Sequence, residues 1–278
     1  MTFDYLHRIF KDSGIQFGEE QKRSLGILDG ESYTNLAHLL SDQCSIGIKF
    51  ASYKDESKTI IRGRHEFEGS LLKQFEDVME YMKMYNPVTT IVDGSPRHKD
   101  IRKYPEVAIR EAVLNAIVHR DYSINGSILV SVFDDHMEVT SLGGLNKDLG
   151  QDDIMLGISS LRNPKLAAVF YRLDMIESYG TGMPKIMGCY RASQSKPIIE
   201  LSTNVFKITL PGIESEEGSD GYGRILRIID RNGSIKRKDV EEELGVSRAK
   251  ANILLQDMVE KGLIIREGSA RSTSYKRA

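Results

Sequence analysis

A single segment, Arg110–Asp121, constrains the fold more than any other part of the chain. Its apolar residues recur at helical spacing, which predicts an amphipathic helix from about Pro105 to His119. Glu111, Asn115 and His119 lie four residues apart and form a polar stripe on that helix. Apolar residues border this stripe on both sides, namely Ile109, Ala112, Val113, Ala116 and Ile117 on one side and Leu114 and Val118 on the other. Buried polar groups need hydrogen-bond partners, so the stripe either is satisfied within the protein or faces a ligand cavity.

The sequence on either side of this helix alternates between helical and strand-like patterns. A second amphipathic helix is predicted over Gly69–Tyr85. Strands are predicted at residues 88–92, 99–103 and 205–210, and a hairpin is predicted from residues 127–133 and 136–141. Helices interleaved with hairpins indicate an α/β layer domain. The first 65 or so residues are less legible and contain only a possible helix at 35–40 and a possible strand at 46–52.

Composition excludes several classes of protein. Hydrophobic residues make up 40% of the chain and charged residues 28%, which is ordinary globular usage. No apolar run is long enough for a transmembrane helix, and the N-terminus lacks the pattern of a signal peptide. The two cysteines, Cys44 and Cys189, lack metal-ligand spacing and disfavour a disulfide framework. We therefore expect a soluble cytoplasmic protein that does not associate with membranes.

The charge is distributed unevenly along the chain. Residues Glu214–Gly221 are polar, acidic and glycine-containing, which predicts a flexible linker. After it, Tyr222–Ala278 contains 13 basic and 8 acidic residues, a balance of +5, against 25 basic and 32 acidic residues in the remainder, a balance of −7. A basic tail on an acidic body indicates a polyanionic partner or simply an uneven surface.

The tail has the order of elements of a winged helix-turn-helix. Helices are predicted at residues 224–231 and 236–244, and the turn Gly245-Val246-Ser247 leads into a third helix with Ser247 as its N-cap. Two short strands at residues 263–266 and 274–276 complete the pattern. In members of this class that bind DNA, the third helix enters the major groove. The candidate DNA contacts are Arg248, Lys250 and Asn252 on the third helix and Arg271, Lys276 and Arg277 in the wing. The alternative is a winged helix that serves for dimerisation or for docking to another domain.

The polar stripe also resembles a known motif. Glu111-x-x-x-Asn115-Ala116-x-x-His119 looks like the N-box of the GHKL ATPases, which include gyrase, Hsp90, histidine kinases and MutL. The resemblance implies that Asn115 helps to hold Mg²⁺ against the phosphates of ATP and that Glu111 is the general base that activates water. Both roles suit the chemistry, because Mg²⁺ prefers oxygen ligands and a carboxylate can accept a proton from water.

A second motif of the same superfamily follows. The stretch around Gly180-Thr181-Gly182 resembles its later glycine box, in which backbone amides and a helix start approach phosphate. His119 is expected either to contact the ligand or to make a structural hydrogen bond. Arg162 is expected either to contact phosphate or to brace a loop.

A closer resemblance is to the ATP-dependent DNA helicase RecG-like C-terminal family, whose bacterial members often follow an AlbA/Schlafen-type domain and are called transcriptional regulators. The similarity is carried by Glu66–Gly69, Arg110–Tyr122, Val132–Asp135, Gly143-Gly144, Ser160–Pro164 and Glu177–Gly182. The ATPases place an adenine-reading Asp before their first glycine box, whereas Ser141-Leu142 precedes Gly143-Gly144 here. Helicase activity is not expected, because the chain contains no P-loop string.

The resemblances together imply an α/β fold, a GHKL-like (Bergerat-type) two-layer sandwich with a C-terminal winged helix. The expected domains are a lead-in module at residues 1–69, a GHKL ATPase-like domain at 70–213, a linker at 214–221 and a winged helix at 222–278. The favoured function is a DNA-binding transcriptional regulator, a homo-oligomer that binds double-stranded DNA. Gly143, Gly144, Gly180 and Gly182 are expected at a site for an adenine nucleotide, with ATP and Mg²⁺ as cofactors. The alternatives are an ATP hydrolase in DNA transactions, with weak or absent turnover, and a nucleotide-free scaffold.

Overall fold

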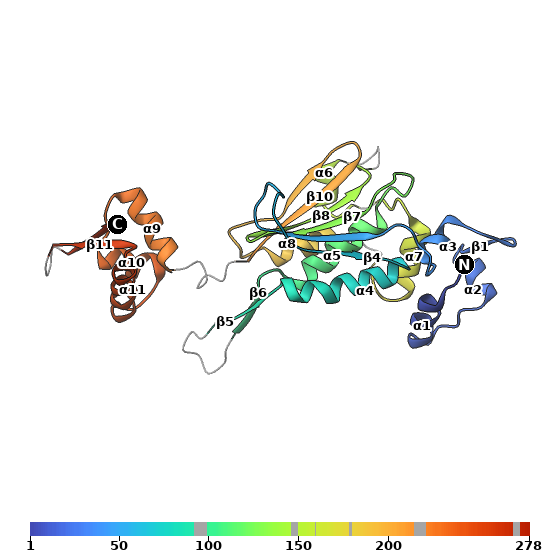
Figure 1. The fold of residues 1–278 in the computed structure, drawn as a ribbon, viewed down its shortest axis with the longest axis horizontal. Helices are drawn as coiled ribbons and strands as arrows, with labels where there is room; N and C mark the ends of the chain where they lie inside the picture. The colour runs from blue at the N-terminus through green and yellow to red at the C-terminus, as the bar shows by residue number, and fades with distance from the viewer. Residues whose placement is uncertain (92–98, 146–149, 159, 178–179, 214–220, 269–272) are drawn as a thin grey trace. The chain divides into compact units, whose positions relative to one another are not determined.

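The computed structural model describes the chain except for residues 92–98, 146–149, 159, 178–179, 214–220 and 269–272 (Figure 1). The chain divides into two compact units. The first consists of Met1–Thr90 and Asp100–Ile213, and the second consists of Ile91–Lys99 and Glu214–Ala278. None of the described helices is long and apolar enough to cross a membrane.

The first unit is built on a mixed six-stranded sheet with the order β4-β3-β7-β8-β10-β9. Only the β3–β7 pair is parallel, and the other neighbours are antiparallel. The strands are β3 (Ile48–Tyr53), β4 (Ile61–Phe67), β7 (Ile128–Val132), β8 (His136–Leu142), β9 (Ile198–Leu201) and β10 (Val205–Pro211). The predicted hairpin is confirmed as β7 and β8, and the predicted strand at 205–210 is confirmed as β10. The short strand β9 was not predicted.

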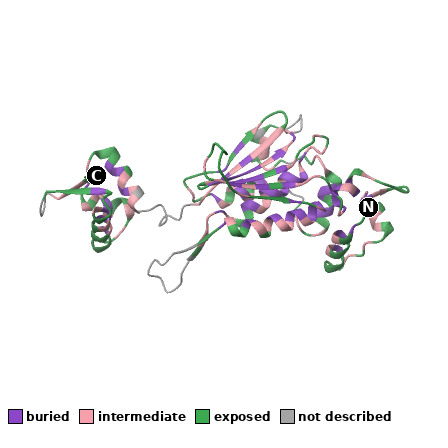
Figure 2. Ribbon diagram, viewed as in Figure 1, coloured by how far each residue is buried: buried purple, intermediate pink, exposed green. Residues whose placement is uncertain are grey.

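The helices of this unit are α4 (Leu71–Met82), α5 (Glu106–Val118), α6 (Gln151–Met155), α7 (Pro164–Arg172) and α8 (Gly182–Cys189), with a 3-10 turn at Lys83–Tyr85. Helices α4, α5, α7 and α8 lie along one side of the sheet, and α6 contacts α8 (Figure 1). Helix α5 lies among α4, α7, α8 and the strands β8 and β10, so that most of its residues are buried (Figure 2). Pro105 is the N-cap of α5 rather than its first helical residue, a small correction to the prediction. A polar stripe on this helix therefore stands inside the unit and not on its surface.

The N-terminal residues form the helices α1 (Asp4–Asp12), α2 (Glu19–Ser24) and α3 (Asn35–Leu40), with a small ladder of β1 (Leu28–Asp29) and β2 (Ser32–Tyr33). The expected boundary between residues 69 and 70 does not separate two units. Strands β3 and β4 precede it, yet they form one side of the six-stranded sheet. Ile48 and Phe50 of β3 and Phe67 of β4 belong to one continuous core with α1 and α5, because a strand buries its apolar face only against the layer that covers its own sheet.

A separate two-stranded ladder connects α4 to α5. It consists of β5 (Val88–Ile91) and β6 (Lys99–Arg102), close to the two strands predicted there. The turn predicted between them, at Asp93–Pro96, lies outside the described residues.

The second unit has the predicted winged-helix order of elements. Its elements are α9 (Gly221–Asn232), α10 (Arg237–Leu244), α11 (Arg248–Glu260), β11 (Ile264–Glu267) and β12 (Ser274–Arg277). Gly245 adopts the left-handed conformation with a φ of +63°, and the Ser247 hydroxyl accepts from the Lys250 amide at 3.4 Å as the N-cap of α11. The unit has its own core around Ile225, Val240, Leu255 and Met258. Of the expected linker, residues 214–220 lie outside the described residues and Gly221 already begins α9.

Candidate functional site

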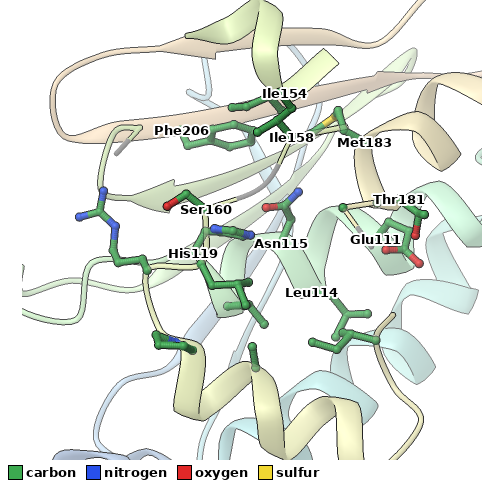
Figure 3. Close-up of a pocket in the computed structure, with 18 of the residues that line it drawn as sticks. Glu111, Leu114, Asn115, His119, Ile154, Ile158, Ser160, Thr181, Met183 and Phe206 are labelled. Carbon is green, nitrogen blue, oxygen red and sulfur yellow. The ribbon is translucent and has the colours of Figure 1, made fainter. Parts of the chain in front are cut away.

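A cavity of about 650 Å³ lies in the first unit between α5, the end of β8, α6, the start of α7 and α8 (Figure 3). The structure brings together around it all the residues of the predicted nucleotide site, namely Glu111, Asn115, His119, Gly143, Gly144, Arg162, Gly180, Thr181 and Gly182. The polar stripe borders the cavity, while two of its members, Glu111 and His119, also have partners within the protein. The roles of the individual residues stay predictions.

Asn115 stands at the middle of the stripe and points into the cavity between His119 and Glu111 (Figure 3). Its side-chain amide makes no hydrogen bond to any residue that the structure describes. The neighbouring residues Leu114 and Val118 are buried and apolar and also line the cavity. A half-buried amide beside apolar walls needs water or a ligand as its partner.

Glu111 is already engaged with cations. Its Oε1 atom lies 3.1 Å from Nη1 of Arg110 and 3.8 Å from Nζ of Lys185. Lys185 also pairs with Glu177 at 2.7 Å. A Cβ atom added to Gly182 would lie 3.2 Å from Oε2 of Glu111, so the glycine leaves room for this carboxylate at the start of α8. Of the two carboxylate oxygens, Oε2 is the one without a cation in contact among the described residues.

His119 is the C-cap of α5 and lies beside Ser160 (Figure 3). Burial, and next the charge of Arg162, hold the pKa of the His119 imidazole below its ordinary value, while a hydrogen bond to the Ser160 backbone opposes this shift. The ring is therefore neutral at neutral pH. It can exchange a hydrogen bond with a ligand but brings no charge to a phosphate.

Arg162 acts as a brace in the structure. Its guanidinium donates to Oδ2 of Asp121 at 2.9 Å and to the carbonyl oxygen of Gly144 at 2.7 Å. The next residue, Asn163, donates to the carbonyl oxygens of Val118 and Arg120 at 2.9 and 2.7 Å. Together these residues fasten the start of α7 to the end of α5. Of the two roles expected for Arg162, the contacts show the structural one.

Gly143 and Gly144 are glycines because other parts of the chain approach them closely. Gly143 has a φ of +107°, and an added Cβ would lie 2.8 Å from Cβ of Asp121. At Gly144 an added Cβ would lie 2.5 Å from the carbonyl oxygens of both Ser202 and Thr203. These contacts explain the glycines without a ligand, although both residues border the cavity.

The residue in the adenine-reading region of the resemblance, Ser141, is buried, and its hydroxyl donates to the carbonyl oxygen of Ala116 at 2.9 Å. It therefore ties β8 to α5 and presents no carboxylate to the cavity.

The apolar wall of the cavity was missed by the sequence analysis. Ile154 and Phe206 lie together on one side of it, with Ile158 and Met183 nearby (Figure 3). Phe206 lies in a strand that the sequence predicts, but which face of that strand borders the cavity depends on its pairing with β8. No group of three or more His, Cys, Asp or Glu side chains among the described residues is arranged to hold a metal ion.

The predicted DNA contacts differ in their surroundings. Arg248, Lys250 and Asn252 are exposed at the start of α11, and their side chains pair with no described residue. In the wing, Lys276 pairs with Glu267 at 2.7 Å, and Arg277 pairs with Asp230. Arg271 lies outside the described residues. Among the described candidate DNA contacts, those on α11 are therefore the ones without a partner.

Comparisons with known proteins agree with this architecture. Residues 219–272 match the model of the MarR family. The C-terminal unit is a MarR-type winged helix. Residues 125–210 match the family described as "Putative ATP-dependent DNA helicase recG C-terminal". Both matches confirm the resemblances drawn from the sequence.

Among solved structures, the DIP2311 protein from Corynebacterium diphtheriae is similar, with 22% identity and a TM-score of 0.64. The match covers 98% of this chain but 60% of that protein, so the chain spans well under the whole length of its structural neighbour. At this identity the likeness shows the fold alone. No curated protein matches the chain.

Proposed function

We propose that this protein is a DNA-binding regulator of transcription, in which the winged helix binds duplex DNA and the central domain binds a small ligand in the cavity. The observation that carries the proposal is the exposed start of α11 in a MarR-type winged helix. There Arg248 and Lys250 offer cations without a carboxylate partner among the described residues. Binding of such a cation to a DNA phosphate is favourable, because it releases counterions from the DNA and breaks no ion pair within the protein.

The cavity fits a Mg²⁺–nucleotide at one end and not at the other. Asn115 offers an amide oxygen of the kind that Mg²⁺ prefers, and Gly180–Gly182 lead into α8, whose first turn offers the backbone amides of Gly182 and Met183. At the opposite end, Ser141 stands where the resemblance places the adenine-reading Asp, and its hydroxyl is bonded to the carbonyl oxygen of Ala116. We therefore propose that the cavity binds a nucleotide mainly through its phosphates, with Asn115 turned toward the metal.

The Asn115→Ala variant should remove the Mg²⁺-dependent part of ATP affinity, since an alanine has no oxygen ligand. Calorimetric titrations with and without Mg²⁺ measure this directly. Asn125→Ala, at an exposed asparagine outside the cavity, is the control and should keep the wild-type response to Mg²⁺. A folded Asn115→Ala protein with an undiminished Mg²⁺ effect would contradict the role given to this residue.

An ATP hydrolase is the second candidate, because Glu111 borders the same cavity as Asn115. We expect slow hydrolysis or none, and no unwinding of duplex DNA. Arg110 and Lys185 hold one oxygen of Glu111, and Ser141 stands in place of the adenine-reading Asp of the ATPases. Orientation of the substrate supplies much of catalysis, so both features favour slow turnover. A strand-separating motor is also missing, since the sequence has no P-loop.

Phosphate release and strand displacement, each with wild type and Glu111→Gln, test this second candidate. Rapid turnover that Glu111→Gln abolishes would establish the hydrolase in place of the slow or inactive protein.

Saturating ATP at 100 times its dissociation constant should stabilise the first unit by about 2.7 kcal/mol. Thermal unfolding that ATP and Mg²⁺ leave unchanged would instead favour a nucleotide-free scaffold.

A further inference from the structure

The helix α11 carries one large apolar residue on its outer face. Ile253 is 68% exposed, whereas Ala251, Leu255 and Met258 of the same helix are buried in the core of the winged helix. At 100° per residue, Ile253 lies nearly opposite to those three residues. An isoleucine in this position leaves apolar surface in water and has a lower helix propensity than alanine.

Single exposed apolar residues are common, so the position of Ile253 carries the argument and its exposure alone does not. Ala249, Asn252, Ile253 and Gln256 share the outward face of α11, since they are spaced by three and four residues. Arg248 and Lys250 flank this face on its two sides. The apolar side chain of Ile253 thus lies in the middle of a polar face. The amides on this face suit base edges, and Arg248 and Lys250 beside it suit phosphates.

The amides on this face are not equivalent. Gln256 donates through Nε2 to Oε1 of Glu260 at 3.2 Å. The Asn252 amide pairs with no described residue and stays free for an external donor–acceptor pair. In the major groove an asparagine amide matches the N6 and N7 atoms of adenine. The adjacent apolar group then faces the one apolar feature of that groove, which is the C5-methyl group of thymine.

We propose that Ile253 contacts a thymine methyl group in the major groove, so that Asn252 and Ile253 together select a site with A·T pairs under the start of α11. This inference rests on the proposed function, because it requires that the winged helix binds duplex DNA through α11. It adds the chemical class of the bases that this helix distinguishes. A second copy of the chain packed on Ile253 is the competing occupant, and the test below separates the two.

The test removes the methyl group and nothing else. Duplexes that the chain of residues 1–278 binds are first selected from a random pool, and each thymine in the selected site is then replaced singly by deoxyuridine. Dissociation constants are measured by fluorescence anisotropy at one fixed salt concentration. At one thymine position of the selected site, wild-type affinity should fall by about four-fold, the effect of about one buried methylene group.

Variants assign that loss to the side chain. Ile253→Ala should bind the thymine duplex about four-fold more weakly and should not respond to deoxyuridine at the sensitive position. Ile253→Val should keep part of the response. Ile198→Ala, at a 58% exposed isoleucine of β9 in the first unit, should bind both duplexes like the wild type. Thermal unfolding of Ile253→Ala checks that the winged helix stays folded.

The outcomes are distinguishable. Equal affinity for thymine and deoxyuridine at every position overturns the methyl contact and leaves DNA binding intact. A uracil effect that persists unchanged in Ile253→Ala assigns the methyl contact to another residue and also overturns the proposal. A change of oligomeric mass in Ile253→Ala, without any uracil effect, shows that a second copy covers this residue. Absence of binding to any duplex removes the proposed function itself and the methyl contact with it.

Discussion

Gly144→Ala should lower the free energy of unfolding of the first unit by about 3 kcal/mol, the upper range for overpacking a closed site. The added Cβ would lie 2.5 Å from the carbonyl oxygens of Ser202 and Thr203, which is far inside van der Waals contact. Both obstacles are backbone atoms in the turn between β9 and β10, so no side-chain rotation relieves the clash. Urea unfolding followed by circular dichroism measures the loss as a shift of the midpoint.

Gly188→Ala is the matched control for this change. Gly188 lies in α8, is exposed, and has nothing within 4 Å of an added Cβ. Alanine is a better helix former than glycine by about 1 kcal/mol, so this variant should be slightly more stable than the wild type. If Gly144→Ala unfolded at the same urea concentration as Gly188→Ala, the close approach at residue 144 would not hold in solution.

Truncation after Ile213 should abolish DNA binding while the first unit stays folded. The winged helix has its own hydrophobic core, so removal of Glu214–Ala278 leaves the core of the first unit complete. Binding by the full chain should weaken steeply with salt, because each phosphate contact contributes about −0.9 to the slope of log affinity against log salt concentration. Electrophoretic mobility shifts at several salt concentrations measure both effects.

Single substitutions sharpen this test. Arg248→Ala and Lys250→Ala should each reduce the salt slope by about one, because their side chains have no ion pair to give up among the described residues. Lys276→Ala and Arg277→Ala should change the slope less, because Glu267 and Asp230 already hold these cations. A mobility shift that survives the truncation unchanged would place DNA binding in the first unit.

Residues close together in sequence explain most of what could be predicted before the structure. Helix periodicity is a local property, so the spacing of Glu111, Asn115 and His119 placed them on one stripe of α5 without knowledge of the fold. The same holds for Gly245 and Ser247, whose turn and cap lie within a few residues of each other. The basic tail and the order of its helices therefore predicted the winged helix correctly.

The roles of several site residues depend on contacts between segments far apart in sequence, which a local sequence pattern does not reveal. Arg162 could have reached a phosphate, but Asp121 and the Gly144 carbonyl hold it. Gly143 and Gly144 resembled part of a ligand loop, yet the nearby Asp121 and the β9–β10 turn account for them. The apolar wall at Phe206 depends on the register of β10 against β8.

The sequence by itself determined helix α5 with its polar stripe, the hairpin of β7 and β8, and the presence of a separate basic winged helix, because each depends on residues close together in the chain. The helices α6 and α7, which also line the cavity, were not predicted. Only the tertiary structure decided that β3 and β4 complete the central sheet, that the Asn115 amide pairs with none of the described residues, and that Glu111 is paired with cations. The physical reason is that strand pairing, close backbone approach and ion pairing join residues far apart in sequence. Their partners become known only when the layers are packed.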